Sequence, residues 1–374
     1  MNKANVLVTG GAGFIGSHLV DALITEGYTV RVLDSLVSQV HGENSKPSYL
    51  NPAAEFVKAD VCDREAVDAA LEDVDIVFHK AAEVGVGQSM YEIERYVRAN
   101  DLGTAVLLEA ILARKSQIRK LVVASSMSIY GEGAYDCEQC GIVFPQLRPS
   151  SQLLDRRWEV ECPKCGRDAK PTSTTEEKPL FPTSIYAVTK QDQEQFCLAV
   201  GRSYGIPTVA LRYFNVYGTR QALSNPYTGV CAIFSGRLLN HNPPMIFEDG
   251  GQTRDFVHVS DIVQANLRAL STDRADYHAV NIGTGVATSV SAVSKLLAKG
   301  LGLNIEPEIV GKYREGDIRH CVADISKARA LLGYEPKVSL ENGIPELLKW
   351  VRAQAAEDQV ESATAELASR QLVR

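Results

Sequence analysis

The sequence predicts an α/β fold in which a doubly wound parallel sheet carries a smaller α/β lobe. Short β-branched runs alternate with helical patterns through the first half of the chain, as in a parallel sheet covered by helices on both faces. A segment rich in Cys, Pro, Ser and Thr breaks this alternation between residues 131 and 182. With 374 residues, 45% of them hydrophobic, the chain can bury a large core in two lobes.

Five β-branched runs are the predicted strands of the main sheet: residues 6–9, 29–34, 76–79, 120–124 and 208–213. Apolar residues at helical spacing between Ile93 and Ala113 predict a long helix packed on this sheet. Another helix begins near Ser184. Shorter elements follow, and they include residues 230–239, a strand over 253–259 and a final helix over 344–351. The last residues, 354–374, are polar and Ala-rich, typical of a frayed helix or a functional tail.

Composition excludes several classes of protein. A formal charge of -7 argues against a broad nucleic-acid surface, which needs clustered Lys and Arg. No apolar run is long enough to span a bilayer, and no signal peptide is expected. Four of the eight cysteines, Cys62, Cys197, Cys231 and Cys321, stand singly in apolar surroundings. We therefore expect a reducing, cytoplasmic location.

A glycine-rich turn follows the first predicted strand and opens a helix. Gly10 permits the tight turn, Gly13 lets the backbone approach a pyrophosphate, and Gly16 allows helix and strand to pack closely. Phe14 and Ile15 lie in the same turn, where the helix N-terminus offers amide donors to an anion. Strand, turn and helix stand in the order that a dinucleotide site requires.

An acidic residue ends the second strand, as in NAD-binding proteins. Asp34 lies 18 residues after the last glycine of the turn, where a carboxylate can accept both ribose hydroxyls. No Arg follows it to pair with a 2′-phosphate, so NAD is favoured over NADP. Asp60 and Val61 are candidates to hold the adenine, although Asp60 can equally be a simple helix cap. Ala81 and Ala82, after the third predicted strand, complete the candidate cofactor contacts.

Tyr186 and Lys190 are four residues apart and so share one helical face. A phenol is a poor base at neutral pH, but a lysine cation and the positive nicotinamide ring lower its pKa. Taken alone, this spacing favours an ordinary pair of side chains on a surface helix. The glycine turn upstream and the serine pair Ser125-Ser126 at a strand end favour an active site.

These motifs together resemble the extended short-chain dehydrogenase/reductases, the family of sugar-nucleotide epimerases, dehydratases and decarboxylases. The resemblance implies a Rossmann sheet in which Tyr186 transfers the proton, Lys190 binds the nicotinamide ribose, and Ser126 hydrogen-bonds the reacting sugar hydroxyl. Asn100 and Thr104 match a helix motif of the family that is mostly structural.

The residues after Ser126 separate the chemistries of this family. The dehydratases carry Asp and Glu where this chain has Met127 and Ser128, and the decarboxylases usually carry Glu at the second position. Methionine is neither an acid nor a base. Oxidation and re-reduction at one carbon remain, and C4 epimerisation through a 4-keto sugar is the simplest form.

The resemblance also implies a site for a nucleotide-diphosphate sugar. Arg254 and Arg314 match arginines that clamp the diphosphate, and paired guanidiniums suit a dianion. A structural salt bridge is the alternative for each. Asn215 is expected on the diphosphate side and Ser89 at the hexose. The base stays open, because the family's usual pattern has Gly where Glu248 stands.

Two Cys-x-x-Cys knuckles lie inside the irregular segment, Cys137 with Cys140 and Cys162 with Cys165, 21 residues apart. Four thiolates at this spacing predict a closed, structural zinc site, with disulfides as the alternative. Ser126 and Tyr186 are 60 positions apart, farther than is usual in the family. The ribbon is therefore expected on the rim of the active site, where it shapes the sugar pocket or a dimer contact.

The expected domains are a Rossmann domain over 1–131 continued by 179–215, a zinc ribbon over 132–178, a lobe mainly over 216–353 and a tail over 354–374. The expected function is an NAD-dependent nucleotide-sugar 4-epimerase that forms homodimers through long helices. The insert, with residues 221–229 and 316–321, is similar to sequences assigned as dTDP-L-rhamnose 4-epimerases. A UDP-hexose or UDP-uronate 4-epimerase, a 4-ketosugar reductase and a non-catalytic NAD sensor are the alternatives.

Overall fold

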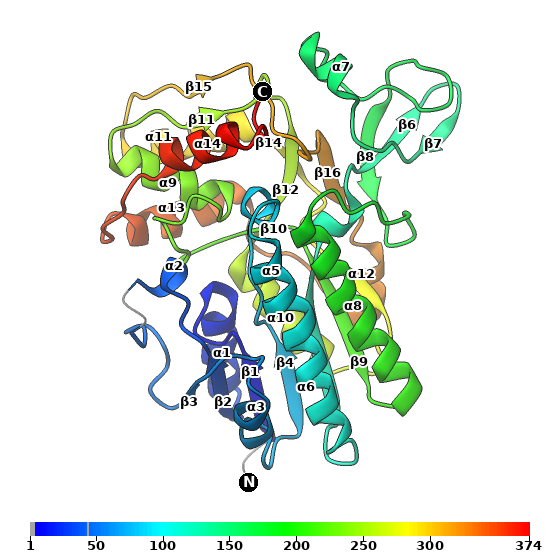
Figure 1. Cartoon of the computed structure of the whole chain (residues 1–374), viewed down its shortest axis with the longest axis vertical. Coiled ribbons are helices and arrows are strands. Elements are labelled where there is room, and N and C mark those ends of the chain that lie inside the picture. The colour runs from blue at the N-terminus through cyan, green and yellow to red at the C-terminus, as the bar shows by residue number, and fades with distance from the viewer. Residues whose placement is uncertain (1–3, 43–44) are drawn as a thin grey trace.

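The computed structural model describes residues 4–42 and 45–374, so residues 1–3 and 43–44 of the expected Rossmann domain lie outside the described residues. Seven parallel strands form the main sheet, in the order β13-β9-β5-β4-β1-β2-β3 (Figure 1). They are β1 (Asn5–Thr9), β2 (Thr29–Asp34), β3 (Glu55–Lys58), β4 (Ile76–His79), β5 (Lys120–Ser126), β9 (Thr208–Tyr213) and β13 (Ala279–Ile282). The predicted parallel sheet is confirmed.

Helices cover both faces of this sheet, and each face has its own hydrophobic core. On one face, Leu19 and Ile262 belong to the same buried cluster. On the other face, Leu107 and Leu198 belong to a second cluster. The first face carries α1 (Phe14–Thr25), α10 (Val259–Leu270) and α12 (Ser326–Leu332), and the second carries α3 (Arg64–Ala70), α6 (Gly103–Leu112) and α8 (Ile185–Tyr204). This is the doubly wound arrangement that the sequence predicts.

The long helix predicted between Ile93 and Ala113 contains a π-helical turn. It consists of α5 (Ile93–Tyr96), a π-helical segment (Val97–Leu102) and α6. The buried side chain of Asn100 lies in that turn and hydrogen-bonds Glu83 N at 2.8 Å and Thr189 Oγ1 at 2.9 Å. The extra residue of the π-helical turn thus goes with an amide side chain, Asn100, that points inward and hydrogen-bonds Thr189 of α8. α6 and α8 lie side by side along the sheet (Figure 1).

The second lobe is built on another sheet, in the order β10-β12-β16-β8-β6-β7, with β14 paired to β12. Its lobe strands are β10 (Asn215–Tyr217), β12 (Thr253–His258), β14 (Ala287–Ser289) and β16 (His320–Ala323). Around it lie α9 (Val230–Leu239), α11 (Val290–Leu301), α13 (Leu340–Val351) and the pair β11 (Met245–Ile246) and β15 (Glu308–Ile309). The insert supplies β6 (Ala134–Cys137), β7 (Gly141–Val143), α7 (Ser150–Leu154) and β8 (Lys170–Thr174). The insert therefore extends the sheet of the lobe.

The last residues fold back onto the lobe. The polar stretch expected as a tail contains α14 (Val360–Ser369), whose Leu367 is buried. Leu367 shares a hydrophobic cluster with Phe247 and Val373. Backbone bonds at 2.9 and 3.0 Å join Tyr313 to Arg374. Among the described residues, no helix combines the length and the apolar character needed to cross a bilayer.

Candidate active site

A cavity of about 520 Å³ opens at the carboxyl edge of the main sheet. The strand order reverses at β1, with β2 on one side and β4 on the other, which is where α/β sheets bind their ligands. Short helices follow these strands and contribute to the walls: α2 (Ser38–His41), α4 (Val86–Ser89) and the 3₁₀ turn Met127–Tyr130. Gly10, Gly13, Phe14, Ile15, Gly16, Asp34, Asp60, Val61, Ala81, Ala82, Ser126, Tyr186, Lys190 and Asn215 all line it.

The glycine turn has the close packing that its sequence predicts. Gly10 has φ +66°, and a Cβ there would lie 2.6 Å from Ala81 N. A Cβ at Gly16 would lie 2.2 Å from the carbonyl oxygen of Gly10. Gly13 begins α1 without a side-chain cap, so the first amides of α1 stay available at the cavity wall. This cradle fits a pyrophosphate.

Asp34 ends β2 with its carboxylate held in place. Oδ2 accepts a hydrogen bond from Ala12 N at 3.0 Å, and Oδ1 accepts one from Leu36 N at 2.9 Å. Asp60 lies beside it on the wall and is not the helix cap considered above, since Asp63 caps α3 by accepting from Ala66 N. Each carboxylate oxygen of Asp34 keeps acceptor capacity for a ribose hydroxyl.

The three candidate catalytic residues converge from two elements. Ser126 ends β5, and Tyr186 and Lys190 lie on α8, whose first turn is capped by the Ser184 side chain. Lys190 Nζ donates a hydrogen bond to Ala124 O at 2.5 Å and another to Gln193 Oε1 at 2.6 Å. α8 thus presents phenol and ammonium to the strand end that carries the serine.

The pKa values of this pair depart from their ordinary values in opposite directions. Burial raises the pKa of Tyr186, and a hydrogen bond with Ser126 lowers it in part. Burial lowers the pKa of Lys190 to about 8, against the charges of Cys197 and Glu194, which raise it. Without a bound cofactor, burial therefore outweighs the groups that lower the phenol pKa, and the positive charge of a nicotinamide ring would add to that of Lys190 in lowering it.

Three of the expected substrate contacts do not line the cavity. Ser89 is fully buried, and its Oγ accepts a hydrogen bond from Tyr186 N at 3.0 Å. Arg254 donates to the carbonyl oxygens of Thr253, Ile318 and Arg319 at 2.7–2.9 Å. Ser89 thus positions the start of α8, and Arg254 ties β12 to the chain entering β16.

Arg314 lies outside the cavity as well. Its Nε donates to Asp317 Oδ2 at 2.8 Å, and its guanidinium stacks on the Phe247 ring, 4.7 Å from the centroid. With its side chain 42% exposed, it keeps donors free for a further anion.

Several cavity residues were missed in the sequence. Lys80 follows β4, and its Nζ donates to Tyr213 Oη at 2.9 Å; burial holds the pKa of Lys80 well below its usual range. The only signal was a lysine directly after a strand at the reversal point. Gln221, Asn225 and Tyr227 also line the cavity. They lie in the loop of residues 221–229, whose similarity to sequences of epimerases was the one sign that it could contribute to the site.

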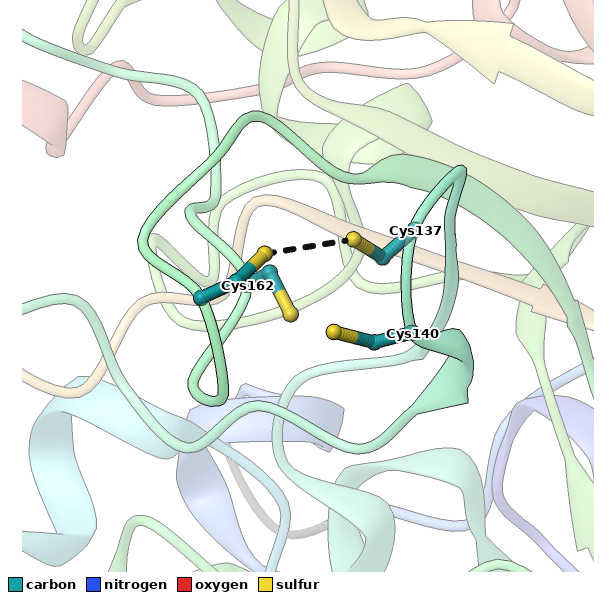
Figure 2. Close-up of side chains that lie close together, drawn as sticks. Cys137, Cys140 and Cys162 are labelled. Atoms are coloured by element: carbon teal, nitrogen blue, oxygen red, sulfur yellow. Dashed lines mark hydrogen bonds between the residues drawn. The ribbon is translucent and has the colours of Figure 1, made fainter.

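The four knuckle cysteines converge in the insert. All four sulfur atoms lie within 4.8 Å of one another, and Cys137 Sγ is 3.6 Å from Cys165 Sγ. Figure 2 shows the sulfurs of Cys137, Cys140 and Cys162 turned toward one another. Tetrahedral zinc with Zn–S bonds of about 2.3 Å places sulfurs about 3.8 Å apart. The donor set and its spacing therefore fit zinc.

The pKa values of the knuckle thiols shift in different directions. Burial and hydrogen bonds with the neighbouring thiols raise the pKa of Cys140 to about 12. At Cys165 the N–H of Arg167 lowers the pKa, but burial and the neighbouring thiols raise it by more. Burial raises the pKa of Cys162, but the N–H groups of Lys164 and Cys165 outweigh it and lower that pKa to about 7. All eight cysteines of the chain are free. The disulfide alternative considered for the knuckles is not what the structure contains.

Comparison with known proteins agrees with this geometry. The model of a family described as "NAD dependent epimerase/dehydratase family" matches residues 6–151 and 162–283. The break between the two matched parts falls within the cysteine-rich insert.

Related proteins align over nearly the whole chain. A dTDP-L-rhamnose 4-epimerase of Burkholderia thailandensis is 37% identical over 92% of this chain and 94% of its own. The crystal structure of Thermotoga maritima UDP-glucose 4-epimerase with UDP-glucose has a TM-score of 0.76 at 35% identity and covers 93% of this chain and 99% of its own.

Bacillus cereus UDP-glucuronic acid 4-epimerase, solved with UDP-glucuronic acid and NAD, has a TM-score of 0.76 at 30% identity and covers 93% of this chain and 99% of its own. These relatives and structural neighbours are sugar-nucleotide epimerases. Since the family model matches more than half of its residues, the chain belongs to the NAD dependent epimerase/dehydratase family.

Proposed function

We propose that the protein is an NAD-dependent nucleotide-sugar 4-epimerase. The observation that carries this proposal is that Ser126, Tyr186 and Lys190 line the same cavity as the glycine turn and Asp34. A proton-transfer group beside a dinucleotide cradle suits reversible oxidation of an alcohol. Gly10, Gly13 and Gly16 would hold the pyrophosphate, and Asp34 the adenosine ribose.

Each catalytic residue has a distinct role in the proposed reaction. NAD held by the glycine turn and Asp34 would supply the hydride acceptor for oxidation at C4 and the hydride donor for re-reduction on the other face. Tyr186 removes the proton of the C4 hydroxyl as oxidation proceeds and gives it back on re-reduction. Lys190 stabilises the Tyr186 anion and binds the nicotinamide ribose. Ser126 hydrogen-bonds the same hydroxyl and keeps it within reach of the phenol.

The cavity wall after Ser126 favours epimerisation over elimination. Met127 and Ser128 both line the cavity. A dehydratase needs proton transfer at two further carbons, and neither side chain supplies a carboxyl group there. The wall of the site therefore supports chemistry at a single carbon.

For the substrate we propose a nucleotide-diphosphate sugar, with dTDP-L-rhamnose as the first choice. The 37% identity to the Burkholderia enzyme supports it. A UDP-hexose or a UDP-uronate is the second choice, supported by the two structural neighbours named above. Asn215, Arg254 and Arg314 are proposed contacts of the diphosphate side, and Ser89 of the sugar. Of these four residues, Asn215 lines the cavity, and Ser89, Arg254 and Arg314 do not.

We propose a structural zinc ion at Cys137, Cys140, Cys162 and Cys165. Four thiolates close the coordination shell and leave no position for substrate. The eight free cysteines also support a reducing, cytoplasmic location.

We propose a homodimer formed through the helix over residues 93–112 and α8. Exposed apolar side chains on these two elements support it: Ile93, Val97, Leu102, Val188 and Phe196 are each at least 39% exposed. Apolar side chains gathered on adjacent helices favour a partner of the same kind.

Substitution of Asp34 tests the cofactor assignment. An Asp34→Ala variant is expected to bind NAD about 10- to 100-fold more weakly, because hydrogen bonds to a charged group contribute about 1.5–3 kcal/mol. NAD released from the purified, denatured protein measures the loss. Asp63→Ala, which removes only the cap of α3, is the control and should keep wild-type NAD content. Equal NAD content in the Asp34 variant would refute the assignment.

The lowered pKa of Lys190 predicts an alkaline limit to activity. Its pKa of about 8 means that the ammonium is present below that pH and is lost above it. The kcat is therefore expected to fall above pH 8, as the charge that stabilises the Tyr186 anion disappears. In Lys190→Arg the guanidinium stays charged, so the fall should move to higher pH. If kcat of the Lys190→Arg variant falls at the same pH as kcat of the wild type, this role of Lys190 is contradicted.

Incubation with a panel of nucleotide sugars tests the function itself. The purified protein is mixed with dTDP-, UDP-, GDP- and CDP-sugars, and the products are analysed by mass spectrometry and NMR. A product of unchanged mass with inverted configuration at C4 is expected. Loss of water or of carbon dioxide would instead identify a dehydratase or a decarboxylase, and no product with any sugar would favour the NAD-sensor alternative.

A further inference from the structure

A buried charge cluster joins the cysteine-rich insert to the substrate lobe. Arg148 of the insert makes a bidentate pair with Glu248 of the lobe, with Nη1–Oε2 and Nη2–Oε1 distances of 3.0 and 2.8 Å. Arg319 Nη1 donates to the same carboxylate at 3.0 Å. The three side chains are only 2–3% exposed. One carboxylate thus holds a guanidinium from each side of the boundary, and we call these three residues the charge latch.

The latch has further contacts on both sides. Arg148 Nη1 donates to Trp158 O in the insert at 2.8 Å, and Arg148 Nη2 to Asp317 O in the lobe at 3.4 Å. Arg319 also pairs with Glu159 of the insert. Since β8 of the insert pairs with β16, the insert and the lobe are connected both by a sheet and by buried ion pairs. Loss of Glu248 would leave the buried Arg148 guanidinium without a carboxylate partner.

Glu248 keeps its side chain at a conformational cost. Its φ is +57°, in the left-handed region where glycine is the usual residue. Such a conformation costs a non-glycine residue roughly 1–2 kcal/mol. A glycine at this position would avoid the strain but would lack the carboxylate that binds Arg148 and Arg319. The residue with the strained backbone is therefore the one whose side chain holds the charge latch together.

The latch touches both neighbours of Arg314. Glu248 follows Phe247, the ring on which the Arg314 guanidinium stacks at 4.7 Å. Asp317, whose carbonyl oxygen accepts from Arg148, pairs through its carboxylate with Arg314 Nε at 2.8 Å. One guanidinium of the insert thus binds the side chain next to Phe247 and the backbone of Asp317, the two residues that contact the Arg314 side chain.

We propose that Arg148 and Glu248 are positioning residues that set the affinity for the nucleoside diphosphate by holding Arg314 in place. This inference rests on the proposed function, because Arg314 is there assigned to the diphosphate. It gives the cysteine-rich insert a task in substrate binding, separate from the cofactor half of the site. Changing the latch alters KM and leaves kcat, NAD content and zinc content unchanged.

The variants Glu248→Gly and Arg148→Met test this inference. Glu248→Gly relieves the left-handed backbone but leaves the Arg148 guanidinium without its carboxylate partner, so Tm is expected to fall. Arg148→Met removes that charge and leaves Glu248 paired with Arg319, so the fold is expected to persist in this variant. Calorimetric titration with dTDP and with UDP should give a Kd about 10-fold higher in each variant, and KM should rise with little change in kcat. The double variant should resemble Glu248→Gly alone, because the two residues act as one pair.

A matched control separates positioning from stability. Arg237, in the same lobe as Glu248, is as buried as Arg148 and pairs with Asp358 at 3.2 Å. Its other partners are Pro243 O and Glu361, so it is not connected to Arg314. Arg237→Met should lower Tm and leave the nucleotide Kd unchanged. If the latch variants behave like this control, losing stability while binding nucleotide normally, the inference is wrong and the proposed function stands. If the wild-type protein binds neither dTDP nor UDP, the inference and both substrate choices are overturned, whereas the proposed epimerase activity is decided separately by the panel of nucleotide sugars.

Discussion

A Tyr186→Phe variant is expected to lose about 10²- to 10⁴-fold in kcat, the usual contribution of a general acid–base group. The substitution removes the phenolic oxygen that carries the C4 hydroxyl proton. The ring packing against Tyr96, 6.5 Å between centroids, and the backbone bond to Ser89 are kept. Folding, NAD content and nucleotide affinity should therefore stay close to wild type. Steady-state kinetics with the substrate identified by the panel measure the loss.

A second tyrosine provides the control for this experiment. The hydroxyl of Tyr334 donates to Gly283 O at 2.9 Å and is buried away from the cavity lining. Tyr334→Phe is expected to cost stability and to leave kcat within a few-fold of wild type. If Tyr186→Phe keeps wild-type kcat, proton transfer must be assigned to another group.

Removing the knuckle thiols is expected to have the second large effect. A structural zinc site contributes on the order of 10 kcal/mol of binding free energy at neutral pH. A Cys137→Ser/Cys162→Ser variant loses one thiolate from each knuckle and should be purified without zinc. Limited proteolysis should then cut the insert, whose small core includes both cysteines with Tyr135 and Val160.

The matched control is Cys62→Ser, which changes a half-buried thiol outside the cluster. Elemental analysis should find about one zinc per chain in wild type and in this control. Unchanged zinc in the double knuckle variant, or no zinc in the wild type, would refute the assignment.

The parts of the site that the sequence predicts well are those set by local geometry. The glycine turn needs small residues at fixed positions, since a Cβ at Gly10 or Gly16 would overlap backbone atoms. Tyr186 and Lys190 share a helical face whatever surrounds that helix. Their motifs stand in the sequence because the constraint acts within a few residues.

The orientation of the arginines could not be predicted in the same way. Arg254 turns to the carbonyl oxygens of Ile318 and Arg319, more than sixty positions away. Arg314 is placed by Phe247, again from a distant segment. A sequence motif gives the residue type, while the partner of a long, flexible side chain depends on which segments the fold brings together.

The C-terminal segment shows a similar limit. Its polar composition is typical of a tail, yet Leu367 is buried, and a Cβ at Gly87 would lie 3.3 Å from it. Val373 pairs with Arg314 as an isolated bridge. A few apolar residues in a polar stretch are enough to hold a helix once a surface is present to receive them, and the sequence does not reveal that surface.

The insert could be predicted as a metal ribbon but not as part of the lobe. Its cysteine spacing is local, whereas the pairing of β8 with β16 joins residues about 150 positions apart. The charge latch likewise combines Arg148 with residues 100 and 171 positions later. Only the tertiary structure shows that the ribbon extends the sheet of the second lobe.

The central claim is that a sugar is oxidised and re-reduced at C4 inside one site. Its most direct test uses a nucleotide sugar with deuterium at C4, incubated in ordinary water, with the product examined by NMR. Because the hydrogen removed from C4 is the one that returns, the inverted product should keep its deuterium at C4. Replacement of the label by solvent hydrogen would contradict the proposed mechanism and point to proton exchange with water.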